Sequence, residues 1–239
     1  MQGAYPPLNT LKPVGEGLWL IDGPAVTHRR LPLPSRAAVA QLADGTLWIH
    51  APTQMTRALQ DELEALGPLA HIFAPNAPHD AHLDAWRHFY PQAGLWTADD
   101  LDKAPPWSDE IDHLILAGAP AHKEAVFYHR RSETLVIADL LANFETERLP
   151  AWVRPFIWLS GTDCPDGGMP PRLRRAFRDR DALAESIMQV IDWRPRRLLL
   201  AHGRWYERDA VAELERAFRK ILSERLWMKA VEDIKARER

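Results

Sequence analysis

The chain has 239 residues and a mass of 27.3 kDa, a length that suits one large α/β domain or two small ones. Thirty Lys and Arg oppose 33 Asp and Glu, and the net charge of −3, with no long run of either sign, gives no support for nucleic-acid binding. The single cysteine, Cys164, excludes an intramolecular disulfide framework and a cysteine-rich zinc finger, so a bound metal would serve chemistry rather than folding.

The first part of the chain predicts an antiparallel start followed by a parallel crossover. Apolar stretches predict strands at Gly17–Ile21, Ala37–Leu42, Thr46–His50 and Ala70–Ala74. Asp44-Gly45 is typical of a hairpin turn. Leucines at helical spacing predict a helix over Met55–Leu66, which lies between two strands and therefore implies a parallel crossover.

The rest of the chain alternates strands and helices. Further strands are predicted at Leu95–Ala98, Ile111–Leu116, Ala125–His129, Thr134–Ala138 and Arg197–Ala201. Helices are expected up to Tyr90, over Asp181–Ile191, and over Asp209–Arg239 with a possible break near Ser223. Ser160–Pro171 is interpreted as an irregular loop.

Polar groups follow several of these strands directly. Asp139 comes after LVIA, His202 after LLLA, and His79-Asp80-Ala81-His82 soon after HIFA. In layered α/β proteins, ligands gather outside the carboxyl ends of strands. Imidazole and carboxylate side chains bind zinc, iron or manganese, and such a metal lowers the pKa of a bound water enough to supply hydroxide. The candidate ligand set is His79, Asp80, His82, His122, Asp139 and His202.

The order of these residues resembles that of the metallo-β-lactamase fold superfamily, from about Leu11 to Ile221. The likeness rests on the His/Asp cluster, His122, TLVIADLL and LLLAHG, and it is closest to a bacterial branch with Pro-Asn-x-x-His in place of His-x-His-x-Asp-His. The resemblance implies one αββα sandwich domain over residues 1–239 with a C-terminal helix, and one or two zinc or iron ions at the sandwich edge. It also implies hydrolysis of an ester, amide, thioester or phosphoester.

Individual positions carry the resemblance to different degrees. Asp139 matches the superfamily's bridging aspartate and His202 its late histidine, whereas His122 is followed by Lys123-Glu124 instead of Thr-Pro-Gly. The motif's first, second and last histidine positions hold Asn76, Pro78 and Ala81. Because proline and alanine cannot bind a metal, either His79 and His82 take over or the usual two-metal site is lost. Asp80 keeps the motif's aspartate and would orient the nucleophile or accept its proton.

Simpler interpretations stand beside these. The His79–His82 cluster also suits a polar helix N-terminus with Asp80 near the N-cap, and Glu124 and His129 are either supports for ligand histidines or an exposed hairpin pair. Asp163 and Asp166 disfavour a reactive thiolate at Cys164. The basic run Arg172–Arg180 is interpreted as a solvated helix face, with contact to an anionic substrate as the alternative.

The sequence therefore predicts a metal-dependent hydrolase acting on a small molecule. The alternatives are a ligand-binding or regulatory protein that has lost its metal site, which needs no cofactor, and a redox enzyme with a di-iron centre. No run of about 18 apolar residues occurs and residues 1–17 lack a signal peptide's apolar region, so we expect a cytoplasmic protein without a membrane partner.

Overall fold

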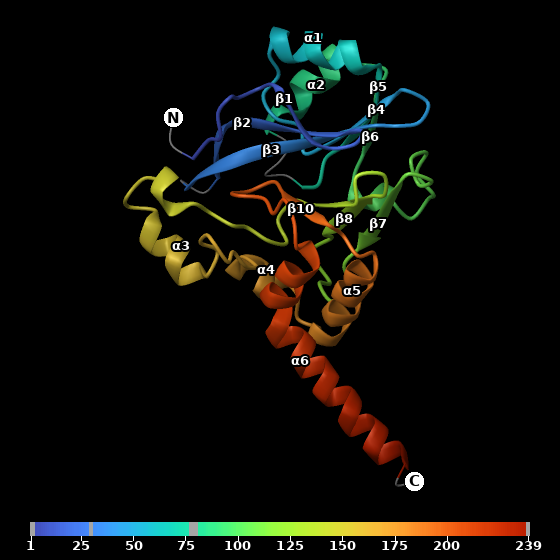
Figure 1. Ribbon diagram of the computed structural model, residues 1–239, viewed down its shortest axis with the longest axis vertical. Coiled ribbons are helices and arrows are strands. Elements are labelled where there is room, and N and C mark those ends of the chain that lie inside the picture. The colour runs from blue at the N-terminus through green and yellow to red at the C-terminus, as the bar shows by residue number, and fades with distance from the viewer. Residues whose placement is uncertain (1–2, 29–30, 77–80, 238–239) are drawn as a thin grey trace.

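The computed structural model describes residues 3–28, 31–76 and 81–237 and places two β-sheets face to face between helical layers (Figure 1). The first sheet has the strand order β1-β2-β3-β4-β5-β6, formed by Leu11–Gly15, Leu18–His28, Leu31–Gln41, Leu47–His50, Leu69–Phe73 and Gly94–Trp96. The second has the order β10-β9-β8-β7, formed by Arg197–Leu200, Thr134–Ile137, Ala125–His129 and Ile111–Ile115.

Six α-helices accompany the sheets in the described ranges. They are α1 Arg57–Leu66, α2 Leu83–Phe89, α3 Arg154–Ser160, α4 Pro171–Ala176, α5 Arg180–Asp192 and α6 Ala210–Arg237. Short 3₁₀ turns include η2 Ala98–Asp100 and η3 Thr146–Arg148. Within these ranges no helix combines the length and the apolar character needed to cross a membrane.

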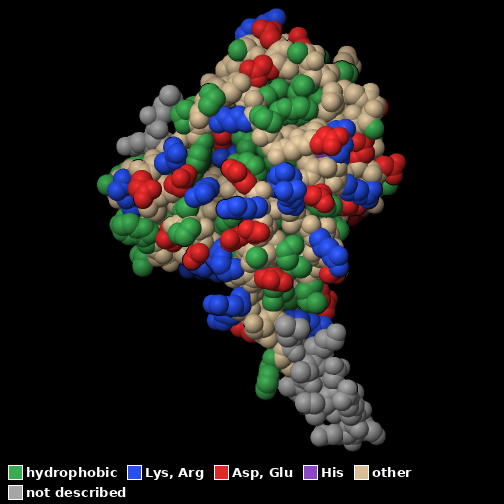
Figure 2. All heavy atoms as spheres, in the orientation of Figure 1, with side chains coloured by type: hydrophobic (Ala, Val, Ile, Leu, Met, Phe, Trp, Pro, Cys, Tyr) green, Lys and Arg blue, Asp and Glu red, His purple; other side chains and the backbone are tan. Residues whose placement is uncertain are grey.

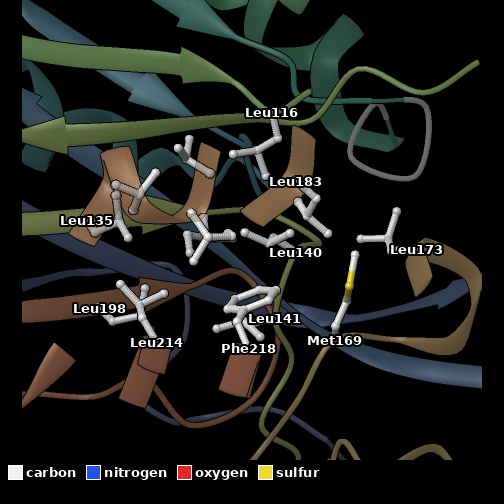
Figure 3. Close-up of a cluster of buried hydrophobic side chains, with 14 of the residues drawn as sticks. Leu116, Leu135, Leu140, Leu141, Met169, Leu173, Leu183, Leu198, Leu214 and Phe218 are labelled. Carbon is white, nitrogen blue, oxygen red and sulfur yellow. The ribbon is translucent and has the colours of Figure 1, made fainter. Parts of the chain in front are cut away.

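Each layer interface has its own apolar cluster. Leu59 and Leu63 of α1 pack with Trp86 of α2 on the outer face of the first sheet. Trp48 of the first sheet and Phe127 of the second meet between the sheets, with ring centroids 5.2 Å apart. On the outer face of the second sheet, leucines from the strands pack against α4, α5 and α6 (Figure 3). Three buried interfaces between four layers define an αββα sandwich, as the sequence predicts.

Most predicted elements are confirmed, although β2 continues seven residues beyond the predicted strand end at Ile21 and β3 begins six residues before the predicted start at Ala37. The Asp44-Gly45 turn joins antiparallel β3 and β4, and β4 and β5 are parallel neighbours connected through α1. The predicted break near Ser223 is wrong, because α6 continues without interruption and projects away from the sandwich (Figure 1). The predicted loop Ser160–Pro171 is irregular between α3 and α4, although its first and last residues belong to those helices.

Candidate functional site

Two polar side chains meet where two neighbouring strands of the second sheet, β9 and the edge strand β10, end. β9 and β10 are parallel neighbours with Ile137 opposite Leu200, so the residues that follow both strands emerge at one edge. Asp139 and His202 each lie two residues beyond these paired positions, and His202 Nε2 is 3.1 Å from Asp139 Oδ1. The parallel register thus brings together two of the residues that the sequence analysis selected.

Hydrogen bonding fixes the protons of this pair. His202 Nδ1 is 2.7 Å from the Pro34 carbonyl oxygen, which can only accept, so Nδ1 donates. Nε2 faces a carboxylate oxygen, which also accepts, and therefore carries a proton too when Asp139 is ionised. Burial alone would lower the pKa of His202, but the hydrogen bond to Asp139 and its negative charge, with the Pro34 carbonyl, raise it. His202 and Asp139 therefore form an ion pair that is 11% and 18% exposed at its side chains.

The first sheet supplies a third member of the site. Asn76 follows β5, and its side-chain Nδ2 donates to Asp139 Oδ2 over 2.8 Å. Asn76 stands where the resemblance places the first ligand histidine, but an amide nitrogen has no lone pair for a metal. Both Asp139 oxygens thus accept hydrogen bonds from this chain, one from Asn76 and one from His202.

A buried glutamate supports the backbone of Asp139. Glu124 Oε1 accepts from the Asp139 and Leu140 amides at 2.9 and 3.1 Å, and Oε2 is 3.1 Å from His122 Nε2. Burial raises the pKa of Glu124, and the nearby Asp139 charge acts in the same direction, against the His122 hydrogen bond. Glu124 therefore positions Asp139, in keeping with the supporting role considered for it, and the His122 ring is held by Glu124.

The backbone on either side of His202 is held by a buried arginine. Arg36 of β3 donates from Nη1 to the Leu200 and Gly203 carbonyls at 2.8 and 2.7 Å. Its Nε and Nη2 both contact Asp22 Oδ1 of β2, at 2.9 and 2.7 Å. Gly203 has φ +86°, and a Cβ there would lie 2.1 Å from the Asn143 carbonyl oxygen, so only glycine allows this turn.

Other predicted site residues lie elsewhere or outside the described part of the chain. His79 and Asp80 fall outside it, together with Pro78. His82 precedes α2; its Nε2 is buried without a hydrogen-bond partner among the described residues, and burial lowers its pKa. His129 is at the opposite end of β8 from Glu124, where Nδ1 contacts Ser132 Oγ at 2.7 Å and burial lowers its pKa to about 4. The structure does not bring His129 to the site.

The described residues alone do not complete a standard two-metal centre. Among residues 3–28, 31–76 and 81–237, no three His, Cys, Asp or Glu side chains are grouped in a way that could hold a metal ion. Asn76 donates a hydrogen bond to Asp139, and His122 Nε2 is hydrogen-bonded to Glu124. Asp139 and His202 are the only two predicted ligands that the described part of the chain joins directly.

A cavity of about 330 Å³ opens beside the ion pair. Asp139 and His202 lie on its wall, and α3 and α4 form the opposite sides through Phe156, Ile157 and Leu173. The remaining wall is mostly apolar, and Arg172, which is exposed, is its one cationic side chain besides His202 among the described lining residues. A volume near the lower end of the range of small-molecule sites, with polar groups at one place on an apolar wall, is typical of a ligand pocket.

The sequence selected Asp139 and His202 as metal ligands and Glu124 as a possible support, but it did not indicate their other partners. The strand-end positions of Asp139 and His202 were readable, whereas Arg36 and Pro34 lie in β3 and reach the site only because the two sheets face each other. Asn76 was noted as a lost ligand, not as a donor to Asp139. No local sequence signal identifies Arg36, although an arginine within an apolar strand demands a buried partner.

Comparison with known proteins places the fold. No protein-family model matches the sequence, and no curated protein matches it. Among solved structures, the DIM-1 metallo-β-lactamase exposed to ceftazidime matches with a TM-score of 0.59 at 10% identity, covering 91% of this chain and 97% of that one.

Two further structures agree. An NDM_FIM-1 like metallo-β-lactamase from Erythrobacter litoralis, in its mono-zinc form, matches with a TM-score of 0.55 at 13% identity over 88% of this chain and 96% of that one. A fragment of a putative diflavin flavoprotein from Nostoc sp. PCC 7120 matches with a TM-score of 0.54 at 11% identity over 96% and 99%. The chain therefore has the fold of the metallo-β-lactamase superfamily.

Proposed function

We propose that this protein binds a small molecule in the cavity beside Asp139 and His202, on a hydrolase-like fold whose usual metal site has been replaced by hydrogen bonds. The observation that carries the proposal is the cavity of about 330 Å³ with an ion pair on an apolar wall. Such a wall suits an amphiphilic ligand. Its polar group would face Asp139 and His202, and its apolar part would lie against Phe144, Phe156 and Leu173.

The replacement of the metal site rests on the partners of Asp139. In a metal centre the Asp139 carboxylate would coordinate metal ions, whereas here Asn76 and His202 each donate a hydrogen bond to one of its oxygens. The protonated imidazole also has no lone pair left for a metal. Buried charges are tolerated when they are paired and hydrogen-bonded, and this network meets that condition with groups of the chain itself.

A metal-dependent hydrolase is the second candidate, and the orientation of His202 favours it. A ligand histidine usually donates its other ring nitrogen to a carbonyl or carboxylate, as His202 Nδ1 does to Pro34. Zinc or iron held by Asp139, His202 and the undescribed His79 would supply a water of lowered pKa. In that case Asp80 would accept the proton of the nucleophile, as expected from the sequence.

Metal content separates the two candidates. We expect metal far below one ion per chain after purification without chelators, and no difference between the wild-type protein and His202→Ala. Stoichiometric zinc or iron that is lost in His202→Ala and Asp139→Ala would favour the hydrolase and contradict the proposed replacement.

Ligand binding is tested separately with 1-anilinonaphthalene-8-sulfonate, a probe with apolar rings and one anionic group. We expect saturable one-site binding that weakens at least fivefold in Leu33→Asn, which places a polar group on the cavity wall. Met188→Asn changes an apolar residue on α5, 42% exposed and outside the cavity lining, and is the matched control. Equal binding by both variants, or no saturable binding, would count against the cavity as the site.

A further inference from the structure

The solvent-facing side of α3 and of the turn just before it is apolar, although it has no partner among the described residues. Trp152, Phe156, Trp158 and Leu159 are 55%, 60%, 56% and 86% exposed. These four make up half of the strongly exposed large apolar side chains in the described ranges, and they fall within eight consecutive residues. Figure 2 shows apolar side chains at the edge of the molecule where Figure 1 places α3. Exposed apolar groups this concentrated mark an interaction surface.

Helical spacing explains why these side chains cannot all turn inward. Val153 and Ile157, four residues apart, are the buried side of the segment and pack with Phe144 and Leu149. Trp152, Phe156 and Leu159 follow the spacing i, i+4, i+7 on a neighbouring stripe, and Trp158 lies on the other flank of Ile157. The sequence thus makes α3 apolar on its outer face as well as on its inner one, which a purely structural helix does not need.

A short run of arginines accompanies this surface. Residues 172–178 contain four arginines and no acidic residue, whereas the longer segment 145–181 has seven arginines and six acidic residues, a net charge of +1. Arg172, Arg174, Arg175 and Arg178, in and just after α4, are exposed. α4 lies against the end of α3, because Arg174 Nη2 donates to the Ser160 carbonyl at 2.9 Å. Apolar aromatic groups beside exposed arginines are the composition of surfaces that bind anionic membranes.

The same surface adjoins the cavity. Phe156 belongs both to the exposed side of α3 and to the cavity lining, and Arg172 is at once an exposed residue of α4 and a lining residue. α3 and α4 therefore form both the side of the cavity and the surface beside it.

We propose that α3 and the arginines of α4 form a surface that docks on anionic lipid bilayers, with Trp152, Trp158 and Leu159 entering the interfacial region. The charge complementarity to an anionic headgroup layer and the continuity with an apolar cavity favour a bilayer over a second copy of this chain, which would bring like-charged α4 segments together. The proposal departs from the expectation of no membrane partner. It requires only that the protein docks on the bilayer surface, which needs no spanning helix. It does not depend on the ligand or metal of the cavity.

Vesicle co-sedimentation of the full chain tests the docking surface. The wild-type protein should bind vesicles of mixed phosphatidylglycerol and phosphatidylcholine and bind pure phosphatidylcholine at least tenfold more weakly. Trp158→Ser with Leu159→Ser, neither of which lines the cavity, should reduce binding to the anionic vesicles at least tenfold. Replacing Arg172, Arg175 and Arg178 by Gln should reduce it by about fivefold per arginine at low salt. Arg174 is left unchanged because it holds the end of α3.

Two controls keep the result interpretable. Trp227→Ser removes another exposed tryptophan, 71% exposed on α6, and should bind vesicles like the wild-type protein. Thermal unfolding should show that all variants fold. The Trp158/Leu159 variant should still bind the sulfonated naphthalene probe, so that loss of docking is distinguished from loss of the cavity site. No binding to anionic vesicles, equal loss in Trp227→Ser, or self-association that is lost only in the Trp158/Leu159 variant would overturn the proposal.

Discussion

Two buried ion pairs connect the first sheet with the chain around His202, and they differ in what their cations can do. In one, Arg36 of β3 binds Asp22 of β2 and the carbonyls of Leu200 and Gly203. In the other, His202 binds Asp139 and the carbonyl of Pro34. Of these four charged residues, only Asp139 and His202 line the cavity. The Arg36–Asp22 pair therefore fixes the backbone around His202, and this backbone in turn positions His202 for its pairing with Asp139.

The chemical difference between the cations explains this division. A guanidinium keeps its charge at every accessible pH, and its five donors suit a permanent cross-link among several acceptors. An imidazole can lose a proton near neutral pH, so its pairing is conditional. A permanent cross-link beside a titratable pair keeps the backbone in place while the proton of the pair changes.

The largest effect should follow from breaking the permanent pair. Arg36→Met keeps the length of the side chain but leaves Asp22 with only Lys12 as a cationic partner among the described residues, and frees two buried carbonyls. We expect a loss of about 3–5 kcal/mol in the free energy of unfolding, measured by urea denaturation. Arg57→Met, which removes an exposed pair with Asp61, is the matched control and should cost about 0.5 kcal/mol or less. Similar losses in both variants would contradict the structural role of Arg36.

A smaller effect should follow from removing the support of Asp139. Glu124→Ala leaves the amides of Asp139 and Leu140 without their acceptor, which should lower the free energy of unfolding by about 2 kcal/mol. Glu124→Gln keeps a carbonyl oxygen for these amides and should restore most of the stability. Equal destabilisation by Ala and Gln would mean that the charge of Glu124, rather than its acceptor role, is what matters.

The two pairs also differ in how far the sequence predicts them. Asp139 and His202 follow apolar strands directly, and parallel neighbours end at the same edge, so local pattern and one topological rule suffice. Many strands and α1 were predictable for a similar reason, because they carry clear hydrophobic periods, whereas the αββα arrangement was implied by the family resemblance. Asp22 and Arg36 are direct partners in the antiparallel β2–β3 register. The Arg36 contacts with Leu200 and Gly203, in contrast, depend on how the two sheets face each other, a long-range property that no local pattern specifies.

At the segment before α2, a sequence motif was recognisable but did not indicate the role of its residues. The resemblance indicates a metal motif there, but Asn76, Pro78 and Ala81 remove the side chains that such a motif needs. The structure then gives Asn76 a different task, donation to Asp139, which follows from the position of the strand end and not from the motif. Similarly, the apolar outer side of α3 is visible in the sequence as Trp152–Leu159, but only the position of α4 and the cavity indicates its use.

The titratable pair should reveal itself through pH. Because the pKa of folded His202 is raised above the unfolded value of 6.5, its pairing stabilises the protein fully below that value and less as pH rises through the folded pKa. The wild-type protein should therefore exceed His202→Gln in stability more at about pH 6 than at about pH 9. Urea denaturation with a chelator present measures this difference, which should be smaller than the loss from Arg36→Met. An advantage over His202→Gln that is constant across this range would contradict an ion pair.

The smallest effect should come from Lys12, which contacts the same aspartate as Arg36 but from a more exposed position. Its Nζ lies 2.7 Å from Asp22 Oδ2, with 23% of its side chain exposed. Because Arg36 keeps Asp22 paired when Lys12 is removed, Lys12→Met should cost only about 0.5 kcal/mol. The two cations share one carboxylate, so the double variant should lose more stability than the two single losses added together, since Asp22 is then buried without either cation. Simple additivity in a double-mutant cycle would show that Lys12 does not compensate for Arg36, and that the buried pair works alone.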